Sequence, residues 1–201
     1  MAEPAPMAEA WRAIAAADSA AALKLIEDNH PGATQELGDK LFLSRLAAAR
    51  KHVDERLPKV DSFGAYSALM NGLAAGFRDG HIWSAPVVAW AVRKWPGIVP
   101  VRRGARWYVG LDERKPNESP LLGAEITACD GEDFDRWAKT RIGLFGGSPD
   151  IEAELSKRAP ALLLDDANPF LKVPTACTFR TATGATGQVT CNFVLSDTGD
   201  L

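Results

Sequence analysis

Asp79, Gly80 and His81 form the segment whose residue types come closest to acid–base chemistry. A carboxylate can orient a neighbouring imidazole, and an oriented imidazole accepts and returns protons near neutral pH. The structural alternative is the end of a helix, where Gly80 takes the left-handed position after the last turn while Asp79 and His81 bind nearby backbone. We expect the structural role, and with it a positive φ angle at Gly80.

Two further segments have both a chemical and a structural interpretation. Ser148 follows two glycines, but a nucleophile elbow needs a strand before the serine, and Pro149 after it is typical of a helix start that Ser148 caps. Asp165 and Asp166 could bind a cation, yet no further acidic residue follows at a regular spacing, so we expect a solvated loop. The sequence therefore predicts no catalytic residue, no metal site and no cofactor in this chain, and we expect no peptide hydrolysis by it.

Arginine and tryptophan side chains gather in the middle of the chain. The cluster comprises Trp90, Arg93, Lys94, Trp95, Arg102, Arg103, Arg106 and Trp107. One interpretation is a peptide groove whose cations bind a free terminal carboxylate, and the other is a hairpin surface with packed indoles. Because side chains alternate along a strand, at most two of the three hairpin arginines can line such a groove. The candidate peptide-binding residues are Arg102, Arg103, Arg106, Trp107 and Gly110.

The three cysteines do not have the spacing of a zinc site. Cys177 and Cys191 lie in two strand-like runs, 173–181 and 187–195, which a turn-forming stretch joins into a hairpin. If Thr181 lies opposite Gly187, Cys177 lies opposite Cys191, about 4.5 Å apart at Cα and within disulfide range. A disulfide would indicate an oxidising compartment. The alternative is a pair of buried thiols.

The elements that would position these residues begin with helices. We expect a helix over 9–17, a second capped by Asp18 or Ser19, a third capped by Asp39 and a fourth capped by Ser62. Apolar residues recur three and four positions apart in the last two helices, which is typical of a small bundle core. These stripes comprise Phe42, Leu46, Ala49, Val53 and Leu57, and then Phe63, Tyr66, Met70, Leu73 and Phe77.

Beyond Gly80 the pattern changes to strands. The runs 98–103 and 106–111 flank Gly104 as a hairpin, and the strand 122–129 ends at an Asp130-Gly131 turn. Asp133 is placed to cap a following helix. The sequence therefore predicts an α+β fold, with a helical domain over residues 1–84 and a mixed β/α domain over residues 85–201.

Two short segments carry a family resemblance. Residues 73–81, ending in Asp79-Gly80-His81, resemble the end of the N-terminal helical domain in carboxyl-terminal processing (tail-specific) serine peptidases. Residues 122–131, ending in Asp130-Gly131, are similar to a characteristic strand and turn of PDZ domains. The resemblance implies a small helical bundle followed by a degenerate PDZ-like domain. It departs from the pattern at Ala124, where an aspartate is usual, and at 109–111, which match the carboxylate-binding loop only in part.

The resemblance implies a role in recognition. In these peptidases a Ser/Lys protease domain follows the PDZ region, so we expect a fragment or a homologue without that part. The chain would be a non-catalytic regulatory and substrate-recognition region that binds polypeptide segments or a peptide C-terminus for the protease domain. A free-standing peptide-binding or scaffold module is the first alternative. A self-contained hydrolase that uses Asp79 and His81 is the second.

Bulk composition excludes several other classes of partner. The net charge of −3 gives no basic field for nucleic acid. No apolar run approaches the ~20 residues of a membrane-spanning helix. The first six residues contain an acid and two prolines instead of the basic start of a signal peptide. From the resemblance we expect a periplasmic or secreted protein whose leader is not part of this chain, with a cytoplasmic location as the alternative.

Overall fold

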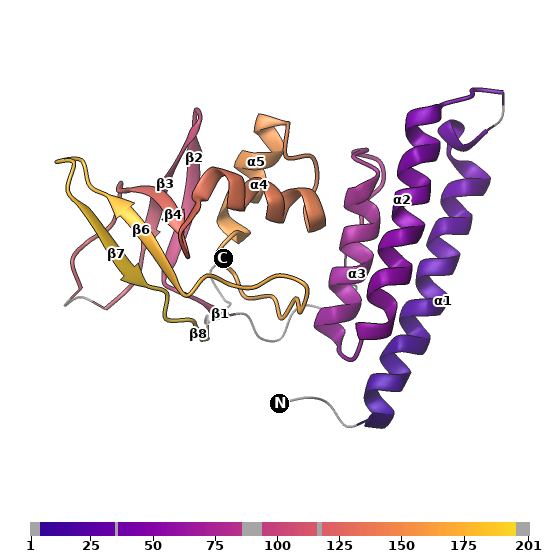
Figure 1. The fold of residues 1–201 in the computed structure, drawn as a ribbon, viewed down its shortest axis with the longest axis horizontal. Coiled ribbons are helices and arrows are strands. Elements are labelled where there is room, and N and C mark those ends of the chain that lie inside the picture. The colour runs from indigo at the N-terminus through magenta and orange to yellow at the C-terminus, as the bar shows by residue number, and fades with distance from the viewer. Residues whose placement is uncertain (1–4, 35, 86–93, 116–117, 196–201) are drawn as a thin grey trace. The chain divides into compact units, whose positions relative to one another are not determined.

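The computed structural model describes residues 5–34, 36–85, 94–115 and 118–195. The chain divides into two compact units (Figure 1). The helical unit comprises Met1–Val87 together with two short later segments, Leu144–Gly147 and Asn168–Phe170. The α+β unit comprises the remaining residues. The chain therefore has the predicted α+β fold class, with its helices first and its sheet second. Trp90 and Arg93 of the basic cluster lie outside the described residues.

Three helices form most of the helical unit: α1 (Ala5–Asn29), α2 (Lys40–Arg56) and α3 (Phe63–Gly76). Two of the predicted caps are confirmed, because Asp39 Oδ1 accepts the N–H of Phe42 at 2.9 Å and Ser62 Oγ accepts the N–H of Ala65 at 3.3 Å. The 3₁₀ turns η1 (Pro31–Ala33) and η2 (Leu57–Lys59) follow the first two helices.

The predicted break between the first two helices is wrong. Neither Asp18 nor Ser19 begins a second helix, because α1 continues through both for 25 residues. The Ser19 hydroxyl donates to Ala16 O at 3.3 Å within the same helix, and Asp18 accepts the hydroxyl of Tyr66 at 2.7 Å. An alanine-rich stretch without glycine or proline favours one continuous helix over a break.

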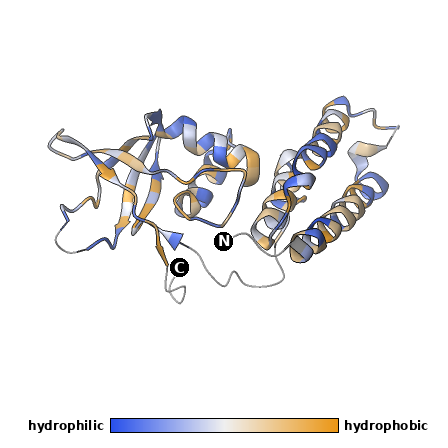
Figure 2. Cartoon of the chain, turned by 60° about the horizontal axis from the view of Figure 1, so that its bottom comes forward, coloured by the Kyte–Doolittle hydropathy of each residue, from blue (hydrophilic) through white to orange (hydrophobic). Residues whose placement is uncertain are grey.

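The apolar stripes of α2 and α3 lie in the core of the helical unit. One buried cluster contains Phe42, Leu46, Ala49, Val53, Leu73 and Phe77. The ring centroids of Phe42 and Phe77 lie 5.4 Å apart. A second cluster packs α1 against α3 and contains Ala15, Val60, Ala65 and Leu69. Figure 2 shows hydrophobic and hydrophilic residues alternating along the helices, as this arrangement requires.

An antiparallel sheet forms the α+β unit, with its strands in the order β2-β3-β4-β6-β7 (Figure 1). These strands are β2 (Ile98–Arg103), β3 (Arg106–Asp112), β4 (Glu125–Cys129), β6 (Ala176–Arg180) and β7 (Thr186–Thr190). The short β5 (Glu132–Asp133) pairs with β4 beside that path. A separate two-stranded pair joins β1 (Lys94–Trp95) and β8 (Val194–Leu195).

Both predicted turns of the sheet are confirmed. Arg103 pairs with Arg106 across a two-residue loop that begins with Gly104 at φ 57°, which suits a type II′ turn. Asp130 and Gly131 have φ angles of 47° and 82° between β4 and β5, as a type I′ turn requires.

Two helices complete the α+β unit. They are α4 (Phe134–Phe145), whose last two residues count with the helical unit, and α5 (Glu152–Arg158), which the 3₁₀ turn η3 (Ala159–Ala161) extends. Asp133 caps α4 as predicted, since its Oδ1 accepts the N–H of Arg136 at 3.0 Å. Ser148 does not begin a helix, because Ile151 is still extended and α5 starts after it. The core contains Trp107, Ile126, Phe134, Leu163 and Phe179.

Candidate functional site

The stretch that ends α3 places a carboxylate between two imidazoles. The helix ends at Gly76 with Phe77 as its C-cap, and the next residue, Arg78, has the left-handed φ angle of 49°. The expected positive φ at Gly80 is therefore wrong, because the helix ends earlier than the Asp-Gly-His pattern suggested. Asp79 lies directly after the left-handed residue, and the tight exit turns its carboxylate back toward the chain.

Asp79 binds both histidines. Its Oδ1 accepts the backbone N–H of His81 at 2.8 Å and lies 3.0 Å from His81 Nδ1, while its Oδ2 lies 3.2 Å from His30 Nε2. The backbone N–H of His81 is the chief cause that lowers the pKa of Asp79, and the side chains of both histidines lower it further. Asp79 therefore stays ionised and holds both rings in fixed orientations.

His30 has a structural part in this arrangement. Its Nδ1 accepts the N–H of Gly32 at 3.1 Å, so the ring proton of the neutral imidazole belongs on Nε2, where it faces Asp79. The ring also stacks on Phe42 with 4.0 Å between centroids. Both nitrogens are engaged and one face is covered, so His30 is not placed to exchange protons with a substrate. Its contact with Asp79 joins residues 49 positions apart, and no local pattern indicates it.

His81 differs, because its side chain is 96% exposed. Asp79 engages Nδ1, which leaves the Nε2 edge of the ring open to solvent. This is the orientation in which a carboxylate prepares a histidine to accept a proton. In the described part of the chain, no serine, threonine or cysteine side chain hydrogen-bonds to either imidazole. The pair therefore has an oriented base, and no hydroxyl or thiol among the described residues is hydrogen-bonded to it as a nucleophile would be.

Arg102 and Trp107, two of the candidate peptide-binding residues, are both engaged in contacts within the α+β unit. The Arg102 side chain is 5% exposed, and its Nε lies 2.8 and 2.9 Å from the two carboxylate oxygens of Glu152. Its Nη1 donates to Asp135 Oδ1 at 2.6 Å, and its guanidinium lies 4.8 Å from the centre of the Trp107 ring. Trp107 is a core residue whose Nε1 donates to the same Asp135 oxygen at 2.9 Å.

Asp135 is the acceptor at the centre of this network, and it was not among the residues predicted from the sequence. Burial opposes ionisation, but hydrogen bonds from Lys139, Trp107 and Arg102 lower the pKa of Asp135 to about 2. The charge of Arg102 is therefore balanced by two carboxylates and is not available to a peptide terminus. An acidic residue in the first turn of a predicted helix was the only signal for Asp135, and it gave no information about its partner.

The other hairpin candidates lie apart from this network. Arg103 and Arg106 are exposed at the turn, and Arg106 lies 3.7 Å from Glu125. Gly110 packs against the neighbouring strand, because a Cβ there would lie 2.4 Å from Val101 Cγ1. Close strand packing explains this glycine without a ligand. Only Arg103 and Arg106 therefore remain as basic groups that a peptide could reach on the hairpin.

The two other described residues of the cluster, Lys94 and Trp95, form β1 of the small β1–β8 pair. Lys94 lies opposite Leu195, and Trp95 is buried opposite Val194. The described members of the cluster thus divide between the first hairpin and this pair instead of lining one groove.

The disulfide joins Cys129 to Cys177, so the Cys177–Cys191 disulfide that the sequence left as one possibility is not formed. Cys129 lies opposite Cys177 in the β4–β6 pair, with 4.0 Å between their Cα atoms. The two residues are separated by 48 positions, and local sequence does not reveal that these two strands are neighbours.

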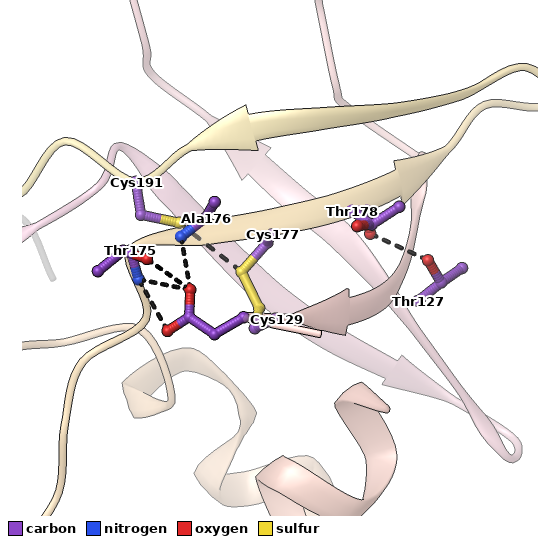
Figure 3. The surroundings of a disulfide bond; sticks show 8 residues. Thr127, Cys129, Thr175, Ala176, Cys177, Thr178 and Cys191 are labelled. Atoms are coloured by element: carbon purple, nitrogen blue, oxygen red, sulfur yellow. Dashed lines mark hydrogen bonds between the residues drawn. A yellow bond between two sulfur atoms is a disulfide. The ribbon is translucent and has the colours of Figure 1, made fainter. Parts of the chain in front are cut away.

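The register of the β6–β7 hairpin explains the error. Gly187 pairs with Phe179 and not with Thr181, so Cys177 lies opposite Val189. A shift of two residues leaves Cys191 on the same face of the sheet. Its Sγ consequently lies 3.7 Å from that of Cys177 (Figure 3). Cys191 is a buried free thiol, and burial raises its pKa to about 11.

Asp130, next to Cys129, also binds residues at the start of β6. Its Oδ1 accepts the hydroxyl of Thr175 at 2.6 Å and the N–H of Ala176 at 3.0 Å, and Ala176 directly precedes Cys177 of the disulfide. The hydrogen bond from the Thr175 hydroxyl is the main cause that lowers the pKa of Asp130. The Asp130-Gly131 turn therefore links β4 to β6 as well as to β5.

The described residues contain neither a metal-binding cluster nor a membrane-spanning helix. No group of three or more histidine, cysteine, aspartate or glutamate side chains there could hold a metal ion. None of the helices described is both long and apolar enough to cross a membrane.

Comparisons with known proteins place this fold beside a protease. Mature CPAF, a chlamydial serine protease, matches 90% of this chain with a TM-score of 0.63 and 18% identity. Mature CPAF complexed with lactacystin matches the same share with a TM-score of 0.65 and 17% identity, and a serine-to-alanine CPAF mutant gives 0.63 and 17%. The match covers only 34% or 35% of each CPAF chain. No protein-family model and no curated protein matches. The chain therefore has a CPAF-like fold.

Proposed function

We propose that this chain is the regulatory and substrate-recognition region of a serine-type processing peptidase. It binds polypeptide segments for a protease domain that lies outside these 201 residues. The likeness of 90% of the chain to about a third of CPAF carries the proposal. The isolated Asp79–His81 pair supports it as well, because an oriented base without a nucleophile is not a complete hydrolase.

The finer assignment is to the carboxyl-terminal processing peptidases, with a degenerate PDZ-like second domain. It rests on residues 73–81 and 122–131. The second segment forms β4 and its type I′ turn, and α4 follows directly, in agreement with the order that the resemblance implies. The Cys129–Cys177 disulfide favours an oxidising compartment, which fits a periplasmic or secreted protein.

Recognition of polypeptide segments is tested by comparing one protein in two states. Fluorescein-labelled α-lactalbumin, either native or reduced and carboxymethylated, is titrated with this chain while anisotropy is recorded. We expect the unfolded form to bind and the native form not to bind, because only an unfolded segment offers free backbone groups. Absence of binding to the unfolded form would overturn the proposal.

A second candidate function is favoured by the exposure of His81. In this alternative, His81 serves as the general base for a serine presented from outside this chain, with Asp79 as its orienting partner. An exposed, oriented imidazole should accelerate the hydrolysis of p-nitrophenyl acetate. His81→Gln should remove this rate and Asp79→Asn should reduce it, while His52→Gln serves as the control. An unchanged rate in His81→Gln would dismiss this candidate.

A further inference from the structure

The two end strands of the sheet, β2 and β7, differ in whether their outer edges can accept a further strand. The strand order leaves β2 and β7 each with a single strand neighbour in that sheet. The outer side of an end strand carries backbone N–H and C=O groups without strand partners, and an extended peptide can bind there as an additional strand. Figure 1 shows β7 at the side of the sheet away from α4 and α5.

Three features make β2 unsuitable for pairing with an added strand. Pro100 lies within the strand and has no N–H to donate. The register with β3 shifts between Val99 and Pro100, which is typical of a bulge. In addition, α5 and η3 contact β2, and Arg102 of this strand binds Glu152 of α5. The edge beside the hairpin arginines is therefore not free to accept a peptide.

The strand β7 has none of these features. Its sequence, Thr-Gly-Gln-Val-Thr, contains neither charge nor proline, and it pairs with β6 over five residues without a shift. Every residue except Val189 is exposed. Within residues 94–115 and 118–195, β6 is its only strand partner. A straight, uncharged edge is the type that accepts a further strand.

The hydrogen bonds at the two ends of the hairpin show which backbone groups point outward. Cys191 N–H donates to Thr175 O at 2.8 Å, and Thr181 N–H donates to Ala185 O at 2.9 Å. Hydrogen-bonded and non-bonded pairs alternate in an antiparallel ladder, so the odd-numbered residues of β7 direct their backbone groups toward β6. The even-numbered residues direct theirs outward, and these are Thr186, Gln188 and Thr190.

We propose that the outer edge of β7 is the site where an extended, uncharged segment of a polypeptide substrate binds as an added strand. This inference rests on the proposed function and identifies where in the chain the polypeptide binds. Backbone hydrogen bonds from Thr186, Gln188 and Thr190 hold the segment and are largely independent of its side chains. The site thus accepts many sequences and does not require a free carboxylate, unlike the arginine groove that the sequence suggested.

A peptide is a better occupant than a second copy of this chain. Five residues of strand extend roughly 17 Å, which is too short to bury the area that a stable dimer needs. The same limit predicts weak and reversible binding of a peptide, as a region that passes substrates to a protease requires. A second copy remains a distinct outcome of the test below.

The proline variant Gln188→Pro removes an outward N–H while leaving the hydrogen bonds between β6 and β7 in place. Gln188→Ala keeps the backbone and is the matched control, and Thr190→Lys adds a charge beside the edge if the proline variant does not fold. The probe is fluorescein-labelled, reduced and carboxymethylated α-lactalbumin. We expect Gln188→Pro to weaken binding by about tenfold or more, since it loses a hydrogen bond and blocks the approach of a strand. Gln188→Ala should bind as wild type does.

Hydrogen exchange of individual amides provides an independent readout. The amides of Thr186, Gln188 and Thr190 should exchange rapidly in the free protein and become protected when the probe is bound. Equal binding by wild type, Gln188→Pro and Thr190→Lys would overturn this inference and leave the proposed function intact. No binding by wild type would overturn both. A wild-type dimer that Gln188→Pro converts to a monomer, seen by sedimentation, would replace the peptide with a second copy.

Discussion

The helical unit and the α+β unit differ in the kinds of contact that join distant parts of the chain. In the helical unit, Asp39 and Ser62 cap helices within three residues, and apolar stripes supply the core. In the α+β unit, the disulfide spans 48 positions and Arg102 reaches carboxylates 33 and 50 residues away. The helical unit therefore joins distant residues by apolar burial and by single polar contacts such as His30–Asp79, and the α+β unit adds a disulfide and an arginine that two carboxylates share.

The largest expected effect is a cavity in the helical unit. Phe77 is fully buried and packs against Phe42. Phe77→Ala should lower the free energy of unfolding by about 3–5 kcal/mol. The substitution removes the apolar ring that folding buries and leaves a cavity in its place. Urea denaturation measures the loss. Leu41→Ala, at an exposed position of α2, is the control and should change it by less than about 0.5 kcal/mol. A small effect at Phe77 would mean that this core does not stabilise the unit.

Loss of the disulfide should be the next largest effect, and it should be confined to the α+β unit. Cys129→Ala should destabilise that unit by about 2–4 kcal/mol, chiefly because the unfolded chain gains freedom. Cys191→Ala removes only a free thiol and should cost less. Thermal melting of both variants and the wild type, with and without reductant, measures the two losses of stability. If Cys191→Ala proved as damaging as Cys129→Ala, the assigned pairing would be wrong.

Acid should destabilise the protein through His52 and through Asp135 in different pH ranges. Burial, assisted by the charge of Arg56, lowers the pKa of His52 from 6.5 to about 4. The unfolded chain therefore takes up this proton first, and the helical unit should lose stability as the pH falls from 6.5 toward 4. The pKa of Asp135 is about 2 instead of 3.8, so the α+β unit should lose its contribution as the pH falls from 3.8 toward 2.

Urea denaturation across this pH series tests the assignment. His52→Gln should flatten the upper part of the stability profile, and Asp135→Asn should flatten the lower part. If His52→Gln changed the stability profile in the lower pH range, or Asp135→Asn changed it in the upper range, the assignment of these two groups would be wrong.

The smallest effect separates two glycines that look alike in the sequence. Both Gly80 and Gly131 follow an aspartate, but only Gly131 has a positive φ angle, 82°. Gly131→Ala should cost about 1 kcal/mol, because a Cβ is disfavoured there. Gly80→Ala meets no atom within 4 Å and should leave the melting temperature almost unchanged. An equal cost at both positions would contradict the helix end at Gly76.

Local signals explain what the sequence could predict. Asp39, Ser62 and Asp133 cap helices within three residues, and the Asp130-Gly131 turn depends on its own φ angles, so each was visible in a short window. The α+β class and the order of helices and strands followed from such windows.

Contacts between distant residues explain the errors. The Cys129–Cys177 pairing depends on β4 lying beside β6, and the neutralisation of Arg102 depends on two helices that follow it in the chain. A hairpin register that differs by two residues keeps the same alternation of side chains, so the apolar pattern could not distinguish the alternatives for Cys177 and Cys191. The open edge of β7 likewise becomes visible only when the strand order is known.

The central claim is that this chain binds unfolded polypeptide and does not cleave it. The most direct measurement follows both properties in one sample, with reduced, carboxymethylated α-lactalbumin as the polypeptide. Anisotropy reports binding, and the mass of the intact polypeptide after prolonged incubation reports cleavage. The account predicts saturable binding and full recovery of the uncut polypeptide. Cleavage that His81→Ala abolishes would show a hydrolase complete within this chain and would contradict the account.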